Sequence, residues 1–374
     1  MRILFTGGGT GGHIFPIITV ARQIKKIYNE ESNLEMFFLG APAGDDFLNV
    51  LENEGIKTKM ILTGKIRRYF SVKNIIDFFK MPFGLIQSFW YLYIWMPDVI
   101  FNKGGFGSVP VVLVGWLYNI PILTHESDVT PGLANRFGAK FSKRIAISFD
   151  KSEKYFAKEK TALIGNPIRT NIIKACFSDS LEDKENARNV LGLTSQRSVI
   201  FILGGSQGAQ ILNQAILMIL PQLLEKYDVI HQCGSKNLEE VKKEVNQIPS
   251  TNYHLFSFLN EEQITAAYFL SDLIISRAGA GSISEIAACG KPSILIPLAN
   301  SANGHQRENA FAYMKTGATI VLEQNNLTSN LFLHEINKIL NNPELIQNIS
   351  INAKNFAKPD AAQKIAESLI EMGR

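Results

Sequence analysis

Four glycine-rich loops, each placed after a short apolar run, are the features of this sequence most able to carry chemistry. They occupy residues 7–12, 104–107, 204–208 and 277–281. A strand that ends in such a loop and opens a helix presents unpaired backbone N–H groups to an anion, and glycine lets a phosphate approach the backbone closely. A tight turn alone can explain a single glycine-rich loop, whereas four such loops favour a ligand that carries phosphate.

Two common nucleotide-binding classes do not fit these loops. Gly7, Gly9 and Gly12 match the G-x-G-x-x-G spacing, but no acid closes the apolar run at 36–39, where a dinucleotide site needs one for the ribose. Gly12 is followed by His13 instead of Lys and then Ser or Thr, which excludes a P-loop. We therefore expect no nicotinamide cofactor, and we expect no other cofactor.

Two titratable side chains stand at predicted helix starts. His13 follows the first glycine loop, either as a capping or packing residue or as a proton acceptor, because a helix N-terminus favours neutral imidazole. Ser282 and Glu285 match the S-x-x-E capping box. Alternatively, Glu285 accepts both hydroxyls of a ribose while amides of the same helix hold a diphosphate. The residues alone leave these readings open.

A polar cluster, His125-Glu126-Ser127-Asp128, follows the apolar pair at 122–123. Parallel sheets bind ligands at the carboxyl ends of their strands, where we expect this cluster to lie. No second His or Asp falls at a metal-ligand spacing, and the chain contains no Asp-x-Asp. The cluster therefore predicts a ligand site without a metal.

The three cysteines are Cys176, Cys233 and Cys289, which are far apart and form no C-x-x-C pair. We therefore expect neither a zinc site nor a disulfide framework. Three isolated thiols are typical of a reducing compartment.

The elements that must position these residues alternate along the chain. Apolar runs of three to five residues followed by helical patterns predict βα units and parallel sheets, hence an α/β fold. The pattern recurs about 200 residues apart, which predicts two similar domains, at 1–168 and 169–354, within the 374 residues. We place the linker at 165–169 and expect a last helix at about 355–374 to pack on the first domain.

Composition narrows the function classes. Hydrophobic residues make up 46% of the chain, which excludes a disordered protein. The net charge of +4 does not favour a nucleic-acid partner.

Residues 61–103 hold all of this basic surplus, and 69–101 hold 11 of the 37 aromatic residues. This segment indicates either an anionic membrane surface bound through about 65–101 or a buried helix contact, and its uncharged stretch at 81–97 is short for a membrane span.

Seven motifs occur in an order that closely resembles the MurG family, the bacterial N-acetylglucosaminyltransferases of peptidoglycan synthesis. They lie at 8–13, 104–105, 125–126, 165–169, 204–209, 276–287 and 305–310. The resemblance implies a GT-B fold, with two Rossmann-like domains across a cleft. It also implies that N-acetylglucosamine moves, with inversion, from UDP-N-acetylglucosamine to the 4-hydroxyl of undecaprenyl-pyrophosphoryl-N-acetylmuramoyl-pentapeptide (lipid I). A peripheral position on the cytoplasmic face of the membrane, and cell-wall synthesis enzymes as candidate partners, are further implications.

The resemblance also implies roles for individual residues. Glu285 is expected on the ribose, Leu259 at the uracil edge, and His305 and Gln306 at the sugar hydroxyls. The implied donor-binding residues are Thr10, Gly11, Gly12, Asp128, Arg169, Ser206, Leu259, Ala280, Gly281, Ser282, Ile283, Ser284, Glu285, His305 and Gln306. The implied acceptor-binding residues are Gly9, Gly104, Gly105 and Asn135. His13 is the first candidate for the catalytic base and Glu126 the second.

Two departures from the family pattern keep the base assignment open. Asp128 stands where the family commonly has Asn, and Phe106 where it often has Tyr. An aspartate near a diphosphate is repelled unless it is protonated or faces a hydroxyl, so Asp128 is itself a candidate base. Three other readings remain: a UDP-sugar:diacylglycerol glycosyltransferase, a UDP-sugar 2-epimerase, and a UDP-sugar-binding scaffold without catalysis.

Overall fold

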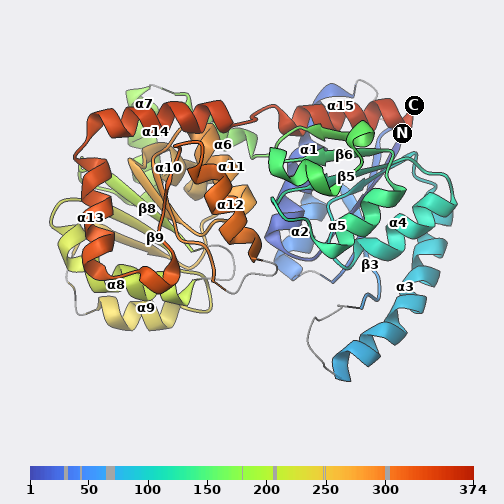
Figure 1. Ribbon diagram of the computed structural model, residues 1–374, viewed down its shortest axis with the longest axis horizontal. Helices are drawn as coiled ribbons and strands as arrows, with labels where there is room; N and C mark the ends of the chain where they lie inside the picture. Colours follow the sequence, from blue (N-terminus) through green and yellow to red (C-terminus); the bar gives the residue numbers. More distant parts are fainter. Residues whose placement is uncertain are drawn as a thin grey trace. The chain divides into compact units, whose positions relative to one another are not determined.

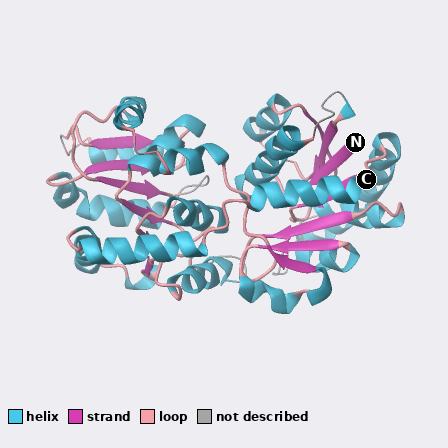
Figure 2. Ribbon diagram, turned by 90° about the horizontal axis from the view of Figure 1, so that it is seen from above, coloured by secondary structure: helices cyan, strands magenta, loops and turns pink. Residues whose placement is uncertain are grey.

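The computed structural model describes most of the chain as two compact units (Figure 1). The described residues are 1–28, 33–42, 44–64, 72–178, 180–204, 209–246, 248, 250–299 and 304–374. At 45–47 and 72–79 only the backbone is described. Unit 1 comprises Met1–Ile168 and Pro359–Arg374, and unit 2 comprises Arg169–Lys358. Each unit is built on one parallel sheet (Figure 2), which confirms the predicted α/β fold with two Rossmann-like domains.

Unit 1 contains a seven-stranded sheet in the order β3-β2-β1-β4-β5-β6-β7. The strands are β1 (Arg2–Thr6), β2 (Glu35–Gly40), β3 (Ile56–Met60), β4 (Val99–Asn102), β5 (Ile122–Glu126), β6 (Arg144–Ile147) and β7 (Thr161–Leu163). Their apolar runs are continuous because helices cover both faces of the sheet. The strand order reverses between β1 and β4, and such switch points are where open parallel sheets bind ligands.

The helices of unit 1 bury two separate cores against this sheet. They are α1 (Gly11–Ile27), α2 (Asp45–Asn53), α3 (Val72–Trp95), α4 (Ser108–Leu117), α5 (Leu133–Gly138) and α15 (Ala361–Gly373), with short 3-10 helices at Ala139–Phe141, Asp150–Tyr155 and Lys158–Lys160. On one face, Ile14, Ile17 and Ile24 of α1 pack with Ile365 and Leu369 of α15. Their helical spacing places one apolar stripe of each helix on the sheet. The opposite face is covered by α4 and the end of α3.

Helix α3 contains much of the aromatic segment, which divides between the core and the surface. Trp95 stacks on Phe37 with ring centroids 4.6 Å apart, and Phe101 in β4 is fully buried. Trp90 and Tyr93 are exposed. No helix among the described residues is both long enough and apolar enough to cross a membrane.

Unit 2 contains a six-stranded sheet in the order β10-β9-β8-β11-β12-β13. The strands are β8 (Val199–Leu203), β9 (Asp228–Gln232), β10 (Tyr253–Phe256), β11 (Leu273–Ser276), β12 (Ser293–Leu295) and β13 (Ile320–Val321). The helices are α6 (Thr170–Cys176), α7 (Leu181–Leu191), α8 (Gln210–Leu224), α9 (Leu238–Val245), α10 (Glu261–Leu270), α11 (Ala280–Cys289), α12 (His305–Met314), α13 (Ser329–Leu340) and α14 (Pro343–Phe356), with a 3-10 helix at Gln324–Asn326. The switch point of this sheet lies between β8 and β11.

The C-terminal helix begins later than the sequence predicts. The expected helix at about 355–374 is instead the end of α14, a break, and α15 from Ala361. Pro359 has no backbone N–H and disfavours the helical conformation of the residue before it, which explains the break. Ala366 and Met372 of α15 lie in the core of unit 1.

The prediction that no disulfide forms is wrong. Cys176, at the end of α6, and Cys289, at the end of α11, form a disulfide with their Cα atoms 5.1 Å apart. They are 113 residues apart in the sequence, so only the packing of α6 against α11 brings them together. Cys233 is a free, buried thiol.

Candidate active site

The glycine loops after β1 and β4 meet at the switch point of unit 1. Gly104 and Gly105 adopt φ values of +91° and +88°, a region in which a side chain is strained. A Cβ atom added to Gly105 would lie 2.8 Å from the backbone nitrogen of Gly8. The two loops therefore touch along their backbones, and only glycine at position 105 permits this approach.

His13 lies in the first turn of α1, beside both loops. The hydroxyl of Thr10 and Nδ1 of His13 are 2.8 Å apart. A Cβ atom on Gly8 would lie 3.0 Å from Nδ1, and one on Gly105 would lie 3.6 Å from Nε2. Thr10 and Gly12 are exposed beside this half-buried imidazole. The structure thus brings together the predicted first-loop residues, including Gly9 and Gly11, with the predicted second loop.

The electrostatic surroundings keep the imidazole of His13 neutral. Burial, and next the positive charge of Lys103, lower its pKa to about 4, although the charge of Asp128 opposes this effect. His13 is therefore an unprotonated imidazole at neutral pH, which is the state that a proton acceptor requires.

Glu126, at the carboxyl end of β5, organises the loop that follows it. Its Oε1 accepts the backbone N–H of Asp128 at 2.8 Å, and its Oε2 accepts Nδ2 of Asn135 at 2.9 Å and the N–H of Gly132 at 3.3 Å. Burial, followed by the charge of Asp128, raises the pKa of Glu126 to about 7, against the effect of these donors and of Lys103. Both oxygens of this candidate base are thus engaged within the protein.

Asn135 connects this loop with the second glycine loop. Its Nδ2 donates to Glu126 and to the carbonyl oxygen of His125. Its buried Oδ1 has no hydrogen-bond partner among the described residues and faces Gly104, where any Cβ atom would collide with it. The predicted acceptor-binding residues Gly104, Gly105 and Asn135 are therefore neighbours.

Lys103 is the site residue that the sequence reasoning missed. The sequence analysis counted it only in the basic surplus of residues 61–103, whereas the structure shows that Lys103 is 3% exposed. Its Nζ donates to the hydroxyl of Ser127, which in turn donates to Oδ1 of Asn166 at 3.2 Å. Burial lowers the pKa of Lys103 to about 8, opposed by Glu126 and Asp128. A lysine directly before a Gly-Gly pair at a strand end was the signal that could have found it.

The N-terminus of α11 is the main feature of the corresponding edge of unit 2. The helix begins at Ala280, and its N-cap residue, Gly279, has no side chain to cap it. The predicted capping box is wrong, because Ser282 lies inside the first turn and not at the N-cap. The first N–H groups of a helix have no intrahelical partner, so this end can bind an anion.

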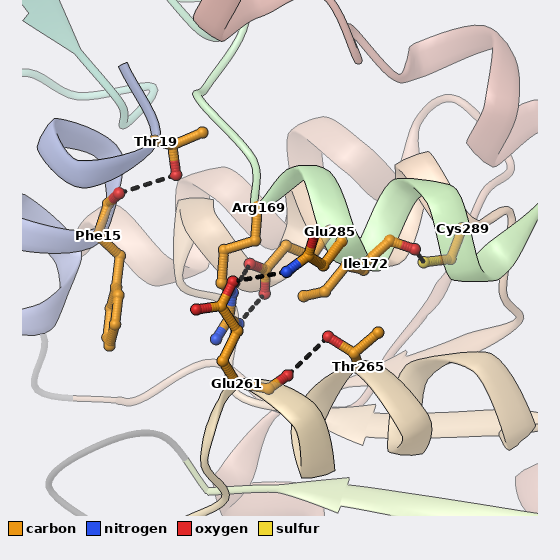
Figure 3. Close-up of polar contacts among 9 residues, drawn as sticks. Phe15, Thr19, Arg169, Ile172, Glu261, Thr265, Glu285 and Cys289 are labelled. Atoms are coloured by element: carbon orange, nitrogen blue, oxygen red, sulfur yellow. Dashed lines mark hydrogen bonds and ion pairs between the residues drawn. The ribbon is translucent and has the colours of Figure 1, made fainter. Parts of the chain in front are cut away.

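Glu285 instead pairs with Arg169, which directly precedes α6 (Figure 3). Nε of Arg169 donates to Oε1 of Glu285 at 2.8 Å, and Nη2 donates to Oε2 at 2.9 Å. The two side chains are 14% and 13% exposed. The sequence analysis named both residues as donor-binding, and the structure brings them together as a bidentate ion pair one helical turn from the start of α11.

The remaining predicted donor residues lie around the carboxyl edge of the unit 2 sheet. Leu259 is buried and donates its N–H to Oε1 of Gln232 at 3.1 Å. His305 and Gln306 open α12, which contacts α11, and Oε1 of Gln306 accepts the N–H of Leu298 at 2.9 Å. Ser206 and the loop at 205–208 lie outside the described residues.

The side chains within the first turns of α11 point in different directions. Ile283 is fully buried in unit 2, so it can meet a ligand only through its backbone. The hydroxyl of Ser284 donates to the carbonyl oxygen of Ala280 at 2.8 Å. The contribution of this segment to a ligand site is therefore mainly its backbone N–H groups and the carboxylate of Glu285.

Two Rossmann-like units with these sites define a class of two-domain enzymes that act on nucleotide sugars. Models of the glycosyltransferase family 28 N-terminal and C-terminal domains match residues 3–147 and 199–365. A curated Bacillus anthracis relative, named UDP-N-acetylglucosamine–N-acetylmuramyl-(pentapeptide) pyrophosphoryl-undecaprenol N-acetylglucosamine transferase 2, is 35% identical over 371 residues, which is 99% of each chain. The chain belongs to this family of N-acetylglucosamine transferases, the MurG family.

Solved structures support the fold. The crystal structure of Acinetobacter baumannii MurG matches with a TM-score of 0.74 and 24% identity over 99% of each chain. A UDP-N-acetylglucosamine 2-epimerase from Neisseria meningitidis, bound to UDP-N-acetylglucosamine, matches with a TM-score of 0.69 and 14% identity over 99% of this chain and all of that one. Transferases and epimerases thus share this architecture, and the fold by itself does not separate them.

Proposed function

We propose that this protein transfers N-acetylglucosamine from UDP-N-acetylglucosamine to the 4-hydroxyl of lipid I and so makes lipid II. The observation that carries this proposal is the full-length match to a relative with this activity in its name, at 35% identity over 371 residues. The site in unit 1 supports it, because acceptor activation needs a neutral base near pH 7. The open N-terminus of α11 supports it as well, because UDP is an anion.

The base that we propose is His13. With Nδ1 donating its proton to the hydroxyl of Thr10, Nε2 is the basic nitrogen and is available to the acceptor hydroxyl. Nε2 takes the proton while the acceptor oxygen attacks the anomeric carbon and the bond to UDP breaks, which inverts that carbon. Glu126 and Asp128 then act by shaping the loop and its charge, since both oxygens of Glu126 already accept hydrogen bonds from the protein.

Unit 2 is the proposed donor-binding unit. The N–H groups at the start of α11 stabilise the diphosphate and the charge that develops on the leaving UDP. Glu285, held by Arg169, accepts the ribose hydroxyls, while Leu259 meets the uracil and His305 with Gln306 orients the sugar. The buried Arg169–Glu285 pair favours this role, because a carboxylate fixed in a bidentate pair offers its remaining lone pairs in one defined direction.

Transfer of radiolabelled N-acetylglucosamine to a soluble lipid I analogue, measured with EDTA present, tests the proposed function. Formation of labelled disaccharide product establishes the reaction and its independence of a divalent metal ion. Label on a diacylglycerol, or conversion of UDP-N-acetylglucosamine to its 2-epimer, would overturn the proposal in favour of one of these alternatives. Binding of UDP-N-acetylglucosamine with no turnover on any of these substrates would favour the scaffold reading.

We also propose that unit 1 binds peripherally to the cytoplasmic face of the membrane through an exposed aromatic patch. Phe89 of α3 and Tyr118, which follows α4, join its two parts with ring centroids 5.7 Å apart. The other exposed members of the patch are Phe83, Ile86, Trp90, Tyr93, Ile94, Met96, Trp116 and Leu117. Exposed aromatic and aliphatic groups gathered on one surface are typical of proteins that enter the membrane interface.

Flotation with anionic liposomes at low salt tests this surface. The wild type is expected to float, and the variant Phe83→Ser/Trp90→Ser/Tyr93→Ser is expected to remain unbound. Leu181→Ser, which removes an exposed leucine from unit 2, is the matched control and should float like the wild type. A wild type that stays unbound at low salt would exclude the membrane proposal.

A further inference from the structure

Lys103 is the buried cation at the centre of the unit 1 site. It follows β4 directly, and its backbone N–H donates to the carbonyl oxygen of Thr6 at 2.9 Å, which anchors it between two central strands. Its side chain is 3% exposed and ends in the hydrogen bond to Ser127. A buried lysine needs a compensating charge, because desolvation disfavours the ammonium form.

The compensating charges come from the loop after β5. Ser127, which accepts the hydrogen bond from Lys103, lies between Glu126 and Asp128, and the carboxylate of Glu126 binds the N–H of Asp128. Two acidic side chains therefore belong to the same tight turn that the ammonium group contacts. Glu126 and Asp128 both favour the charged form of Lys103.

His13 is a further titratable side chain close to Lys103, beside the first glycine loop. A Cβ atom added to Gly7 would lie 3.5 Å from Cβ of His13 and 3.6 Å from Cβ of Lys103, so the two side chains flank the same residue. The charged and titratable groups that interact with Lys103 are thus His13 from α1, and His125, Glu126 and Asp128 from β5 and its loop.

We propose that Lys103 is a positioning residue that balances the charges of the site: its ammonium group offsets the charge of the Glu126–Asp128 turn and disfavours protonation of the imidazole of His13. This balance allows a carboxylate at position 128, where the family pattern commonly has Asn. The role in transfer rests on the proposed function, whereas the effect on His13 does not. Because Nζ is buried and bonded to Ser127, Lys103 acts through its neighbours and does not itself bind the substrate.

Histidine titration by NMR tests the charge balance without any need for activity. In protein labelled at its six histidines, the signal of His13 is assigned by its loss in His13→Asn. The wild-type signal should not titrate above about pH 5, because the pKa of His13 is lowered to about 4. Lys103→Met should raise the pKa of His13 above its wild-type value, because a neighbouring positive charge is removed.

The double variant makes this test specific. Asp128→Asn should lower the pKa of His13 below its wild-type value, and Lys103→Met/Asp128→Asn should return it close to that value, because both charges are then absent. Lys140→Met removes an exposed lysine of the same unit and should change nothing. If Lys103→Met leaves the titration of His13 where it is in the wild type, or if the double variant does not reverse the shift, the proposal is wrong.

Transfer activity supplies the second readout. Lys103→Met should lower kcat/KM at pH 7 by about tenfold or more, because the Glu126–Asp128 turn then carries uncompensated negative charge beside the site. The double variant should recover most of this loss. Lys103→Arg should retain more activity than Lys103→Met because it keeps the charge. If the double variant is as impaired as Lys103→Met, Lys103 binds substrate directly and charge balance is not its role. If the wild type transfers no sugar, the proposed function fails, while the histidine titration still decides the role of Lys103.

Discussion

The two units place different kinds of polar groups at the same edge of the same kind of sheet. In unit 1, His13, Lys103 and Glu126 meet where the strand order reverses, and the protein itself satisfies most of their hydrogen bonds. In unit 2, the corresponding edge holds the ion pair Arg169–Glu285 beside a helix start whose N-cap residue, Gly279, has no side chain. Unit 1 thus shifts the pKa values of its polar side chains, whereas unit 2 presents the backbone N–H groups of a helix start.

This difference agrees with the proposed division of the reaction, in which unit 1 moves the proton and unit 2 binds the donor. Groups whose pKa is shifted by burial and neighbouring charge are candidates for proton transfer. Open N–H groups at a helix N-terminus bind anions with little selectivity for the rest of the ligand. Changes in unit 1 should therefore alter mainly kcat, and changes in unit 2 should alter mainly the KM for UDP-N-acetylglucosamine.

The largest expected effect comes from removing the proposed base. His13→Ala should lower kcat by about 10²–10⁴-fold, the usual contribution of a general base, while the KM for UDP-N-acetylglucosamine changes little. Steady-state kinetics with a lipid I analogue measures both constants. Full activity in this variant would show that His13 is not the base. It would also contradict the assignment of proton transfer to unit 1.

The disulfide should produce the next largest effect, and only in unit 2, which contains all three cysteines. Breaking the Cys176–Cys289 bond removes a constraint on the unfolded chain that is typically worth about 2–4 kcal/mol. Calorimetry with and without dithiothreitol should show a lower Tm for one of two transitions. Cys176→Ser/Cys289→Ser should melt like the reduced wild type and should not respond to dithiothreitol. A transition that a reductant does not shift, with the bond shown to be cleaved, would contradict this expectation.

The contact between the two glycine loops of unit 1 can be tested by its contribution to stability. Gly105→Ala should cost about 1–3 kcal/mol of unfolding free energy, because alanine is strained at positive φ and its Cβ would meet the backbone of Gly8. Gly132→Ala is the matched control, since nothing lies within 4 Å of the added Cβ, and it should cost less than about 1 kcal/mol. Urea unfolding measures both values, and equal costs would show that the close approach is not required.

The smallest effect is expected from the ion pair of unit 2. Glu285→Ala should raise the KM for UDP-N-acetylglucosamine about tenfold, with kcat nearly unchanged, because it removes binding that the ground state and the transition state share. Glu262→Ala, an exposed acidic residue of the same unit, should leave both constants unchanged. An unchanged KM in Glu285→Ala would leave Glu285 as a structural partner of Arg169 alone.

Much of the fold could be predicted from local patterns. Each of the four glycine loops does follow a strand, and a helix begins within or just after each loop, because continuous apolar runs and glycine punctuation are local signals. The break before α15 was missed although Pro359 is visible in the sequence, since the apolar pattern on both sides continues a helical period. The polar cluster after β5 was also predicted at the correct edge of the sheet.

The candidate site was only partly predictable. Glu285 was identified, but its partner, Arg169, lies 116 residues away, and the spacing of Ser282 indicated a cap instead. Lys103 was counted only in the basic surplus of its segment, because sequence composition does not report burial. The pairing of Cys176 with Cys289 is equally hidden, since it depends on how α6 packs on α11.

The sequence by itself determined the alternation of strands and helices, the glycine positions and the family, all of which depend on residue order. Only the tertiary structure decided which charges meet. The pKa of His13 falls because of burial and of Lys103, which is 90 residues away in the sequence, and Glu285 is positioned by Arg169, which is 116 residues away. The free energy of a charged group depends on its solvent exposure and on the charges near it in space, which neighbours in sequence do not specify.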